Sequence, residues 1–207
     1  MEVNCCNKET AQENLEEGSA RLINASGVFF HLEELHSVIE GIKYLLSEDG
    51  VFIVQFMYAG AMIENHNFDT IYHEHLCYYT LRSLMNLLKP YGLEVFDAYH
   101  SDIHSGSIIA KVTHSGGKLN KKTERFDSVL SQDEKYTLDE FLSFAKAVES
   151  KKNDLRDLLV HLKNEGKTVY AYGAPAKGNT LLNYFGITKE LVSKAVEIND
   201  LKIGNYL

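Results

Sequence analysis

Hydrophobic and polar positions in the first part of the chain alternate in a strand, helix, strand order. Residues 21–25 (RLINA) form a short β-type run, and residues 31–46 carry apolar side chains at helical spacing. The EDG sequence at 48–50 ends this helix. Residues 51–56 (VFIVQF) then form a continuous apolar strand of the kind that is buried on both faces of a parallel sheet. This order predicts an α/β fold.

The pattern continues with a loop, a helix and two further strands. The helix is predicted near 81–89 and is ended by Pro90 and Gly92. Strands are predicted at 93–99 and 107–114, and the short connection between them indicates antiparallel pairing.

A second pattern follows after residues 117–136, which lose hydrophobic periodicity and gain Gly, Lys and Asp, as a linker does. Residues 137–166 predict one long amphipathic helix that ends at Gly166. Residues 167–185 then run strand, Gly-rich turn, helix, and 193–200 favour another strand. We therefore expect a first domain at 1–116, a linker at 117–136 and the start of a second α/β unit, with an incomplete sheet, at 137–207.

Composition and charge exclude several classes of protein. The chain has 207 residues, of which 44% are hydrophobic and 24% charged, so it can bury a core. Its net charge of −8, with no Lys/Arg block, argues against nucleic acid as a partner. No apolar run is long enough to cross a membrane and the first residues have no apolar signal core, so we expect a cytoplasmic protein.

The segment Gly173 to Thr180 (GAPAKGNT) lies between a predicted strand and a predicted helix. Backbone N–H groups and the helix dipole can bind phosphate in that position. The spacing imitates the P-loop, but Asn179 stands where the lysine must be, and Lys177 comes two positions early. A nucleoside triphosphatase is therefore disfavoured. Two interpretations stay open: an anion or nucleotide-diphosphate site, or a tight turn that needs glycine only for its backbone geometry.

The block YHEH, Tyr72 to His75, raises three alternatives: a metal site, a proton-transfer site or a solvated polar loop. The HExxH arrangement is absent, and Glu74 would point away from His73 and His75 in an extended chain. A histidine titrates near neutral pH and a nearby carboxylate or phenol can orient it, so these residue types suit acid–base chemistry better. The turn DIHSGS at 102–107 adds a second histidine beside hydroxyl groups.

Five blocks occur together in one order and spacing. They are GVFFHL (27–32), GVFIVQFMY (50–58), FDTIYHEHLCYYTL (68–81), GLEVFDAYHSDIHSGS (92–107) and GKTVYAYGAPAKGNTLLNYFGI (166–187). In these blocks the chain closely resembles the S-adenosylmethionine-dependent C-methyltransferases that act on nucleotide-linked keto-deoxysugars. The resemblance implies the C-terminal half of a class I (Rossmann-like) methyltransferase sheet, from its fourth strand onward. It also implies that a second, incomplete Rossmann-like α/β unit follows, which would bind the nucleotide sugar.

The resemblance also implies roles for individual residues. His75 would be the general base that removes a proton from the carbon next to the sugar ketone, with Tyr72 and Glu74 as its partners at the sugar. The resulting enolate would attack the methyl group of S-adenosylmethionine, and no metal is needed. Substrate-binding residues would be Tyr58, His104, Ser105 (a glycine in the family), Gly106, Ser107, Gly173, Ala174, Pro175, Ala176, Lys177, Gly178 and Asn179. Cofactor-binding residues would be Ala25, Ser26 and His31.

The chain departs from the family pattern at both ends. The cysteine-rich zinc domain and the first strands of the sheet, with their glycine-rich cofactor loop, have no counterpart in it, so it looks like a piece of a larger enzyme. The expected ligand is a nucleotide sugar, dTDP-linked by resemblance. The alternative is a non-catalytic remnant that binds a nucleotide sugar or completes its fold with another chain. Unpaired edges at 21–25 and 51–56 would favour self-association.

Overall fold

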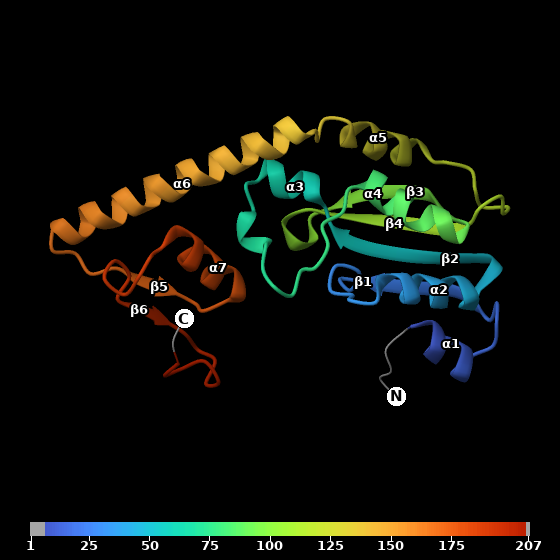
Figure 1. Ribbon diagram of the computed structural model, residues 1–207, viewed down its shortest axis with the longest axis horizontal. Coiled ribbons are helices and arrows are strands. Elements are labelled where there is room, and N and C mark those ends of the chain that lie inside the picture. Colours follow the sequence, from blue (N-terminus) through green and yellow to red (C-terminus); the bar gives the residue numbers. More distant parts are fainter. Residues whose placement is uncertain (1–6, 206–207) are drawn as a thin grey trace. The chain divides into compact units, whose positions relative to one another are not determined.

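The computed structural model describes residues 7–205, which form two compact units (Figure 1). The first unit comprises the residues up to 62 together with 75–137, and the second comprises 63–74 and the residues from 138 onward. Each unit has its own sheet. The α/β fold class predicted from the sequence is confirmed.

The first unit is built on a mixed four-stranded sheet. Its strands are β1 (Ala20–Ser26), β2 (Leu46–Met57), β3 (Leu93–Ser101) and β4 (Ser107–His114), and their order is β1-β2-β4-β3. β1 and β2 are parallel, whereas β4 runs antiparallel to both of its neighbours. The four predicted strands and the antiparallel closing pair are therefore confirmed. The last strand, β4, lies inside the sheet, between β2 and β3.

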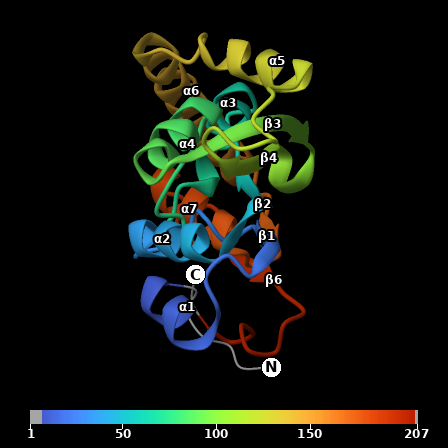
Figure 2. The ribbon, with the colours of Figure 1, turned by 90° about the vertical axis from the view of Figure 1, so that its right-hand side faces the viewer.

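Two helices cover one face of this sheet. α2 (Leu35–Leu45) follows β1, and α4 (Leu81–Leu88) precedes β3; both lie on the same side of the strands (Figure 2). α4 begins at Thr80, whose side chain accepts from the Ser83 amide in a capping box. Two short helices, α1 (Lys8–Asn14) and α3 (Ala59–Glu64), were not predicted from the sequence.

The core of the first unit lies between the sheet and these helices. Phe52, Val54 and Phe56 of β2 are fully buried on that side. Val51 and Ile53, which alternate with them, are only partly buried, so the expectation of a strand buried on both faces is wrong for these two residues. Alternate side chains of a strand point to opposite faces, and α2 and α4 lie on one of them.

The interval 117–136, predicted to be a linker, contains a helix that packs on the first unit. α5 (Glu124–Asp133) begins at Thr123, whose hydroxyl accepts from the Phe126 amide. Phe126 and Val129 are buried in the core of this unit. Phe126 and Val129 stand at helical spacing, but the helix is short and lies in an interval rich in Gly, Lys and Asp, which led to the linker prediction.

The second unit contains a strand, helix, strand motif. Its elements are α6 (Leu138–Asn164), β5 (Tyr170–Tyr172), α7 (Ala176–Phe185) and β6 (Lys194–Val196), and β5 and β6 pair in parallel. The long helix, the Gly-rich turn and both strands agree with the sequence prediction. Among residues 7–205, no helix combines the length and apolar content needed to cross a lipid bilayer.

Candidate functional site

The carboxyl ends of β1 and β2 meet at the edge of the sheet where β4 begins. Ser26 pairs with Gln55, and Met57 pairs with Ser107. Ligands of open α/β sheets bind in the crevice outside the carboxyl ends of parallel strands. The segments after β1 and β2 and before β4 are therefore the candidate site of the first unit.

Three histidines from these segments gather around Phe30. The ring centroid of Phe30 lies 4.4 Å from that of His31, 5.0 Å from that of His75 and 6.3 Å from that of His104. The rings of His31 and His75 are themselves 5.0 Å apart. The Phe30 carbonyl accepts the amide of Leu76 at 2.7 Å, which joins the end of the YHEH block to the segment after β1. The fold thus brings together a residue expected at the cofactor, His31, with two expected at the substrate.

The side chains of this cluster are of a type that can transfer protons. Imidazole groups exchange protons near neutral pH. Within the part of the chain that the structure describes, no group of three or more His, Cys, Asp or Glu residues is arranged to hold a metal ion.

The turn that carries His104 is held in an unusual backbone conformation. His104 and Ser105 have φ angles of 55° and 63°, and that of Gly106 is 126°. The resemblance predicts a glycine at position 105, where the positive φ favours glycine over serine. The Gly106 carbonyl accepts the amide of Tyr58 at 3.1 Å, which ties the turn to the end of β2.

Gln55 connects both sides of this edge, and the sequence analysis did not identify it. Its Oε1 accepts the Ser26 hydroxyl at 3.2 Å, and its Nε2 donates to the Ser107 hydroxyl oxygen at 2.8 Å. The only sequence signal is a polar residue inside the apolar run VFIVQF.

Tyr58, expected at the substrate, is buried and its hydroxyl faces the interior of the first unit. It donates to Asp133 at 2.7 Å, and the other carboxylate oxygen of Asp133 accepts the Arg82 amide at 2.7 Å in the first turn of α4. Burial and the adjacent Asp133 carboxylate raise the pKa of Tyr58 well above its usual range. In this arrangement the phenol stays neutral and stabilises the fold.

The YHEH block spans the boundary between the units, because Tyr72 to Glu74 belong to the second and His75 to the first. The side chains of His73 and Glu74 are 87% and 61% exposed, and His73 Nε2 lies 4.0 Å from Glu74 Oε1. Burial, and then the Glu74 charge, raise the pKa of Tyr72. Upstream, Phe68 stacks on Phe185 of α7 with centroids 4.9 Å apart.

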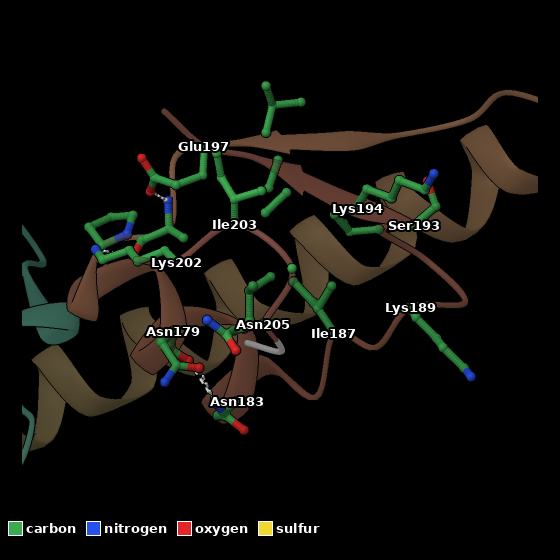
Figure 3. Close-up of a pocket in the computed structure, with 18 of the residues that line it drawn as sticks. Asn179, Asn183, Ile187, Lys189, Ser193, Lys194, Glu197, Lys202, Ile203 and Asn205 are labelled. Atoms are coloured by element: carbon green, nitrogen blue, oxygen red, sulfur yellow. Dashed lines mark hydrogen bonds between the residues drawn. The ribbon is translucent and has the colours of Figure 1, made fainter. Parts of the chain in front are cut away.

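The Gly-rich turn of the second unit is held by the last residue of β6 and by residues that follow this strand. Gly173, with φ of 88°, donates its amide to Val196, and the Ala174 amide donates to Glu197 at 2.8 Å. Lys202 donates to the Ala174 carbonyl at 2.8 Å (Figure 3). The backbone amides of Ala174, Asn199 and Ile198 lower the pKa of Glu197.

An open pocket of about 1050 Å³ adjoins this turn. Ala174, Pro175, Ala176 and Asn179 of the predicted segment line it, together with Glu197 and Lys202. Pro175 is the N-cap residue of α7 and makes no side-chain hydrogen bond. The first backbone amides of α7 are therefore not capped by this residue. The sequence predicted this turn, but it did not predict that the Glu197 carboxylate accepts the Ala174 amide.

Comparison with known proteins identifies the family. The sequence profile of the C-methyltransferase C-terminal domain matches residues 102–207, and the chain belongs to this family. Its sequence is 32% identical over 193 residues to the C-methyltransferase NovU of Streptomyces niveus, a match that covers 92% of this chain and 46% of NovU. The chain thus spans about half the length of this relative.

Two solved structures show weak similarity. One contains the Haloferax volcanii Trm112 methyltransferase activator (TM-score 0.40, 12% identity, 49% of this chain and 57% of that chain). The other is a SAM-dependent methyltransferase from Thermotoga maritima (TM-score 0.37, 14% identity, 48% of this chain and 59% of that chain). TM-scores this low do not establish a common architecture, and the assignment rests on the family profile.

Proposed function

We propose that this protein takes part in the S-adenosylmethionine-dependent C-methylation of a nucleotide-linked keto-deoxysugar through an enolate. Membership in a C-methyltransferase family supports carbon as the methyl acceptor. The observation that carries the proposal is the position of His75, beside Phe30 and His31 at the carboxyl edge of β1 and β2.

His75 is the general base in this proposal. A carbon next to a ketone becomes nucleophilic only when its proton is removed, and an imidazole can take that proton near neutral pH. The Phe30 ring packs against the His75 ring with their planes at 78°, which limits water on that side of His75. Tyr72 and Glu74, from the same block as His75, are proposed to contact the sugar, whereas Tyr58, also expected at the sugar, is buried with its hydroxyl on Asp133.

The turn with His104, Ser105, Gly106 and Ser107 is the proposed contact for the sugar in the first unit. Donors close to a ketone oxygen stabilise the charge that develops when the enolate forms. An imidazole N–H of His104 supplies such a donor, and its ring lies 6.3 Å from Phe30, on which His75 also packs.

Ala25, Ser26 and His31 are the residues that would hold S-adenosylmethionine. Ser26 suits a ligand that carries hydroxyl groups. Its hydroxyl donates its own proton to Gln55, and the lone pairs of its oxygen can still accept a hydrogen bond from the ligand. When bound, this cofactor supplies an electrophilic methyl group. The chain's own residues orient the acceptor carbon and keep water from it.

The turn from Gly173 to Asn179 is proposed to bind the nucleotide diphosphate, with dTDP as the expected nucleotide. The Ala174 amide already donates to Glu197, so the amides available to a phosphate are those of the first turn of α7. Lys177 adds a positive charge in that turn.

A second candidate function is nucleotide-sugar binding without catalysis, in a chain that completes its sheet with another chain. β1 favours it, because among residues 7–205 this strand pairs only with β2, and its Leu22 is exposed. Isothermal titration calorimetry separates the two candidates. Binding of S-adenosylmethionine and of a dTDP-linked keto-deoxysugar supports the methyltransferase, and binding of the sugar nucleotide alone supports the second candidate. Binding of neither contradicts both.

A further inference from the structure

A chain of hydrogen bonds runs from the exposed Ser26 at the end of β1, through the buried side chains of Gln55 and Ser107, to the turn between β3 and β4. The Ser26 hydroxyl donates to Gln55 Oε1, Gln55 Nε2 donates to Ser107 Oγ, and the Ser107 hydroxyl donates to the Ile103 carbonyl at 2.7 Å. Gln55 is 3% exposed and Ser107 is fully buried. Each of these three bonds is donated by the residue nearer to β1, so the bonds all point from β1 toward the turn.

The turn at the end of this chain stores backbone strain. Two consecutive residues other than glycine, His104 and Ser105, have positive φ angles, each of which costs about 1–3 kcal/mol and persists only when the surroundings hold it. The Ile103 carbonyl closes the turn by accepting both the Ser107 hydroxyl and, at 3.2 Å, the Gly106 amide. The Ser107 hydroxyl therefore stabilises the strained conformation.

Gln55 and His104 also flank the same residue. A Cβ atom at Gly27, the residue after β1, would lie 3.7 Å from Gln55 Oε1 and 3.8 Å from His104 Nε2. The amide of Gln55 and the imidazole of His104 are thus neighbours at the carboxyl edge of the sheet.

We infer that Gln55 is a positioning residue that holds the 103–107 turn, and with it the His104 imidazole, against the end of β1. The inference rests on the proposed function only in the statement that this turn contacts the sugar. Its physical basis is the low cost of a fully satisfied buried polar network and the high cost of a broken one. Through Gln55, the residues expected at the cofactor and those expected at the substrate keep a fixed relative position.

Backbone amide hydrogen exchange of residues 1–207, followed by NMR, tests the inference without any ligand. Ser26→Ala is the sharpest variant, because Ser26 reaches the turn through Gln55. Gln55→Met keeps side-chain length and removes both amide bonds. We expect both variants to speed exchange of the Gly106 amide about fivefold or more, the equivalent of one lost hydrogen bond. Exchange of the Lys111 amide, in the middle of the sheet, should stay unchanged. Ser19→Ala, whose hydroxyl donates to the Glu16 carbonyl, is the control and should change neither.

Unchanged Gly106 exchange in a folded Gln55→Met or Ser26→Ala protein would overturn the inference. An equal increase at Gly106 and Lys111 would also overturn it, because that result indicates a general loss of stability. If Gln55→Met does not fold, Ser26→Ala decides. Calorimetry with a dTDP-linked keto-deoxysugar adds a separate readout: weaker binding by Gln55→Met supports the link to the substrate. If no form of the protein binds the sugar nucleotide while exchange rises locally, the positioning role stands and the proposed function fails.

Discussion

Gly106 lies against Ala61 so closely that a Cβ atom at position 106 would overlap the Cβ of Ala61. The contact joins the turn before β4 to α3, which follows β2. Gly106 also has a φ angle of 126°, which side chains rarely adopt. Both sterics and backbone conformation therefore require glycine here.

We predict that Gly106→Ala lowers the free energy of unfolding by more than Gly92→Ala does. Gly92 has a positive φ of 68° but nothing within 4 Å of its virtual Cβ, so its substitution carries only the conformational cost of about 1–2 kcal/mol. Overpacking against Ala61 should add about 1–3 kcal/mol at position 106. Urea denaturation of both variants measures the difference, and equal losses would contradict the close contact.

A second prediction concerns Asp97, a buried carboxylate on β3. It accepts from Thr123 at 2.7 Å, pairs with Lys111 at 3.1 Å and with Arg125, and its side chain is 2% exposed. The Arg125 guanidinium, with help from Thr123 and Lys111, holds the pKa of this carboxyl well below its usual range. Asp97→Asn should therefore cost about 1.5–3 kcal/mol at neutral pH.

The same group predicts how stability depends on pH. Because the pKa of Asp97 is lower in the folded than in the unfolded protein, its stabilising contribution is complete above the ordinary value of 3.8 and is lost as the pH falls below it. Urea titrations at decreasing pH should show a steeper acid loss in the wild type than in Asp97→Asn. Asp49→Asn, at an exposed pair with Lys118, is the control and should follow the wild type. Parallel acid profiles of all three proteins would disprove the assignment.

A third prediction addresses the pair of Tyr58 and Asp133. Tyr58→Phe should destabilise the first unit by about 1–2 kcal/mol, because it leaves a buried oxygen of Asp133 without its donor. In a double-mutant cycle with Asp133→Asn the losses should not add. Tyr170→Phe, at an exposed tyrosine, should have no effect. Additive losses would mean that the two side chains do not interact.

A fourth prediction tests the anion site of the second unit. Lys177→Ala should weaken binding of dTDP about tenfold, because a charge-assisted contact to phosphate is lost. Lys189→Ala is the matched control, since Lys189 lines the same pocket away from the Gly-rich turn. Equal effects of the two changes on calorimetric affinity would indicate general electrostatics and not a site at the turn.

Much of the fold follows from local patterns. The apolar run 51–56 and the β-branched run 107–114 predict their strands because a buried strand leaves a short-range signal. α5 was missed because it has only 10 residues and lies in an interval rich in Gly, Lys and Asp, although Phe126 and Val129 stand at helical spacing.

The site is harder to predict because its contacts join segments far apart in sequence. His75 meets His31 since the Phe30 carbonyl binds the Leu76 amide, and Gln55 meets Ser107 across two strands. No spacing rule gives these contacts. The resemblance predicts which residues act at the site. The partners of Gln55, Tyr58 and Glu197 become visible only in the fold.

Hydrogen–deuterium exchange of the substrate measures the proposed removal by His75 of the proton next to the sugar ketone. The protein is mixed in D₂O with a dTDP-linked keto-deoxysugar and no methyl donor, and the α-proton signal is followed by NMR. We predict that the wild type and His73→Ala, whose imidazole is exposed, exchange this proton at the same rate. His75→Ala should be slower by about 100-fold or more. Exchange by His75→Ala at the wild-type rate would show that His75 is not the base that removes this proton.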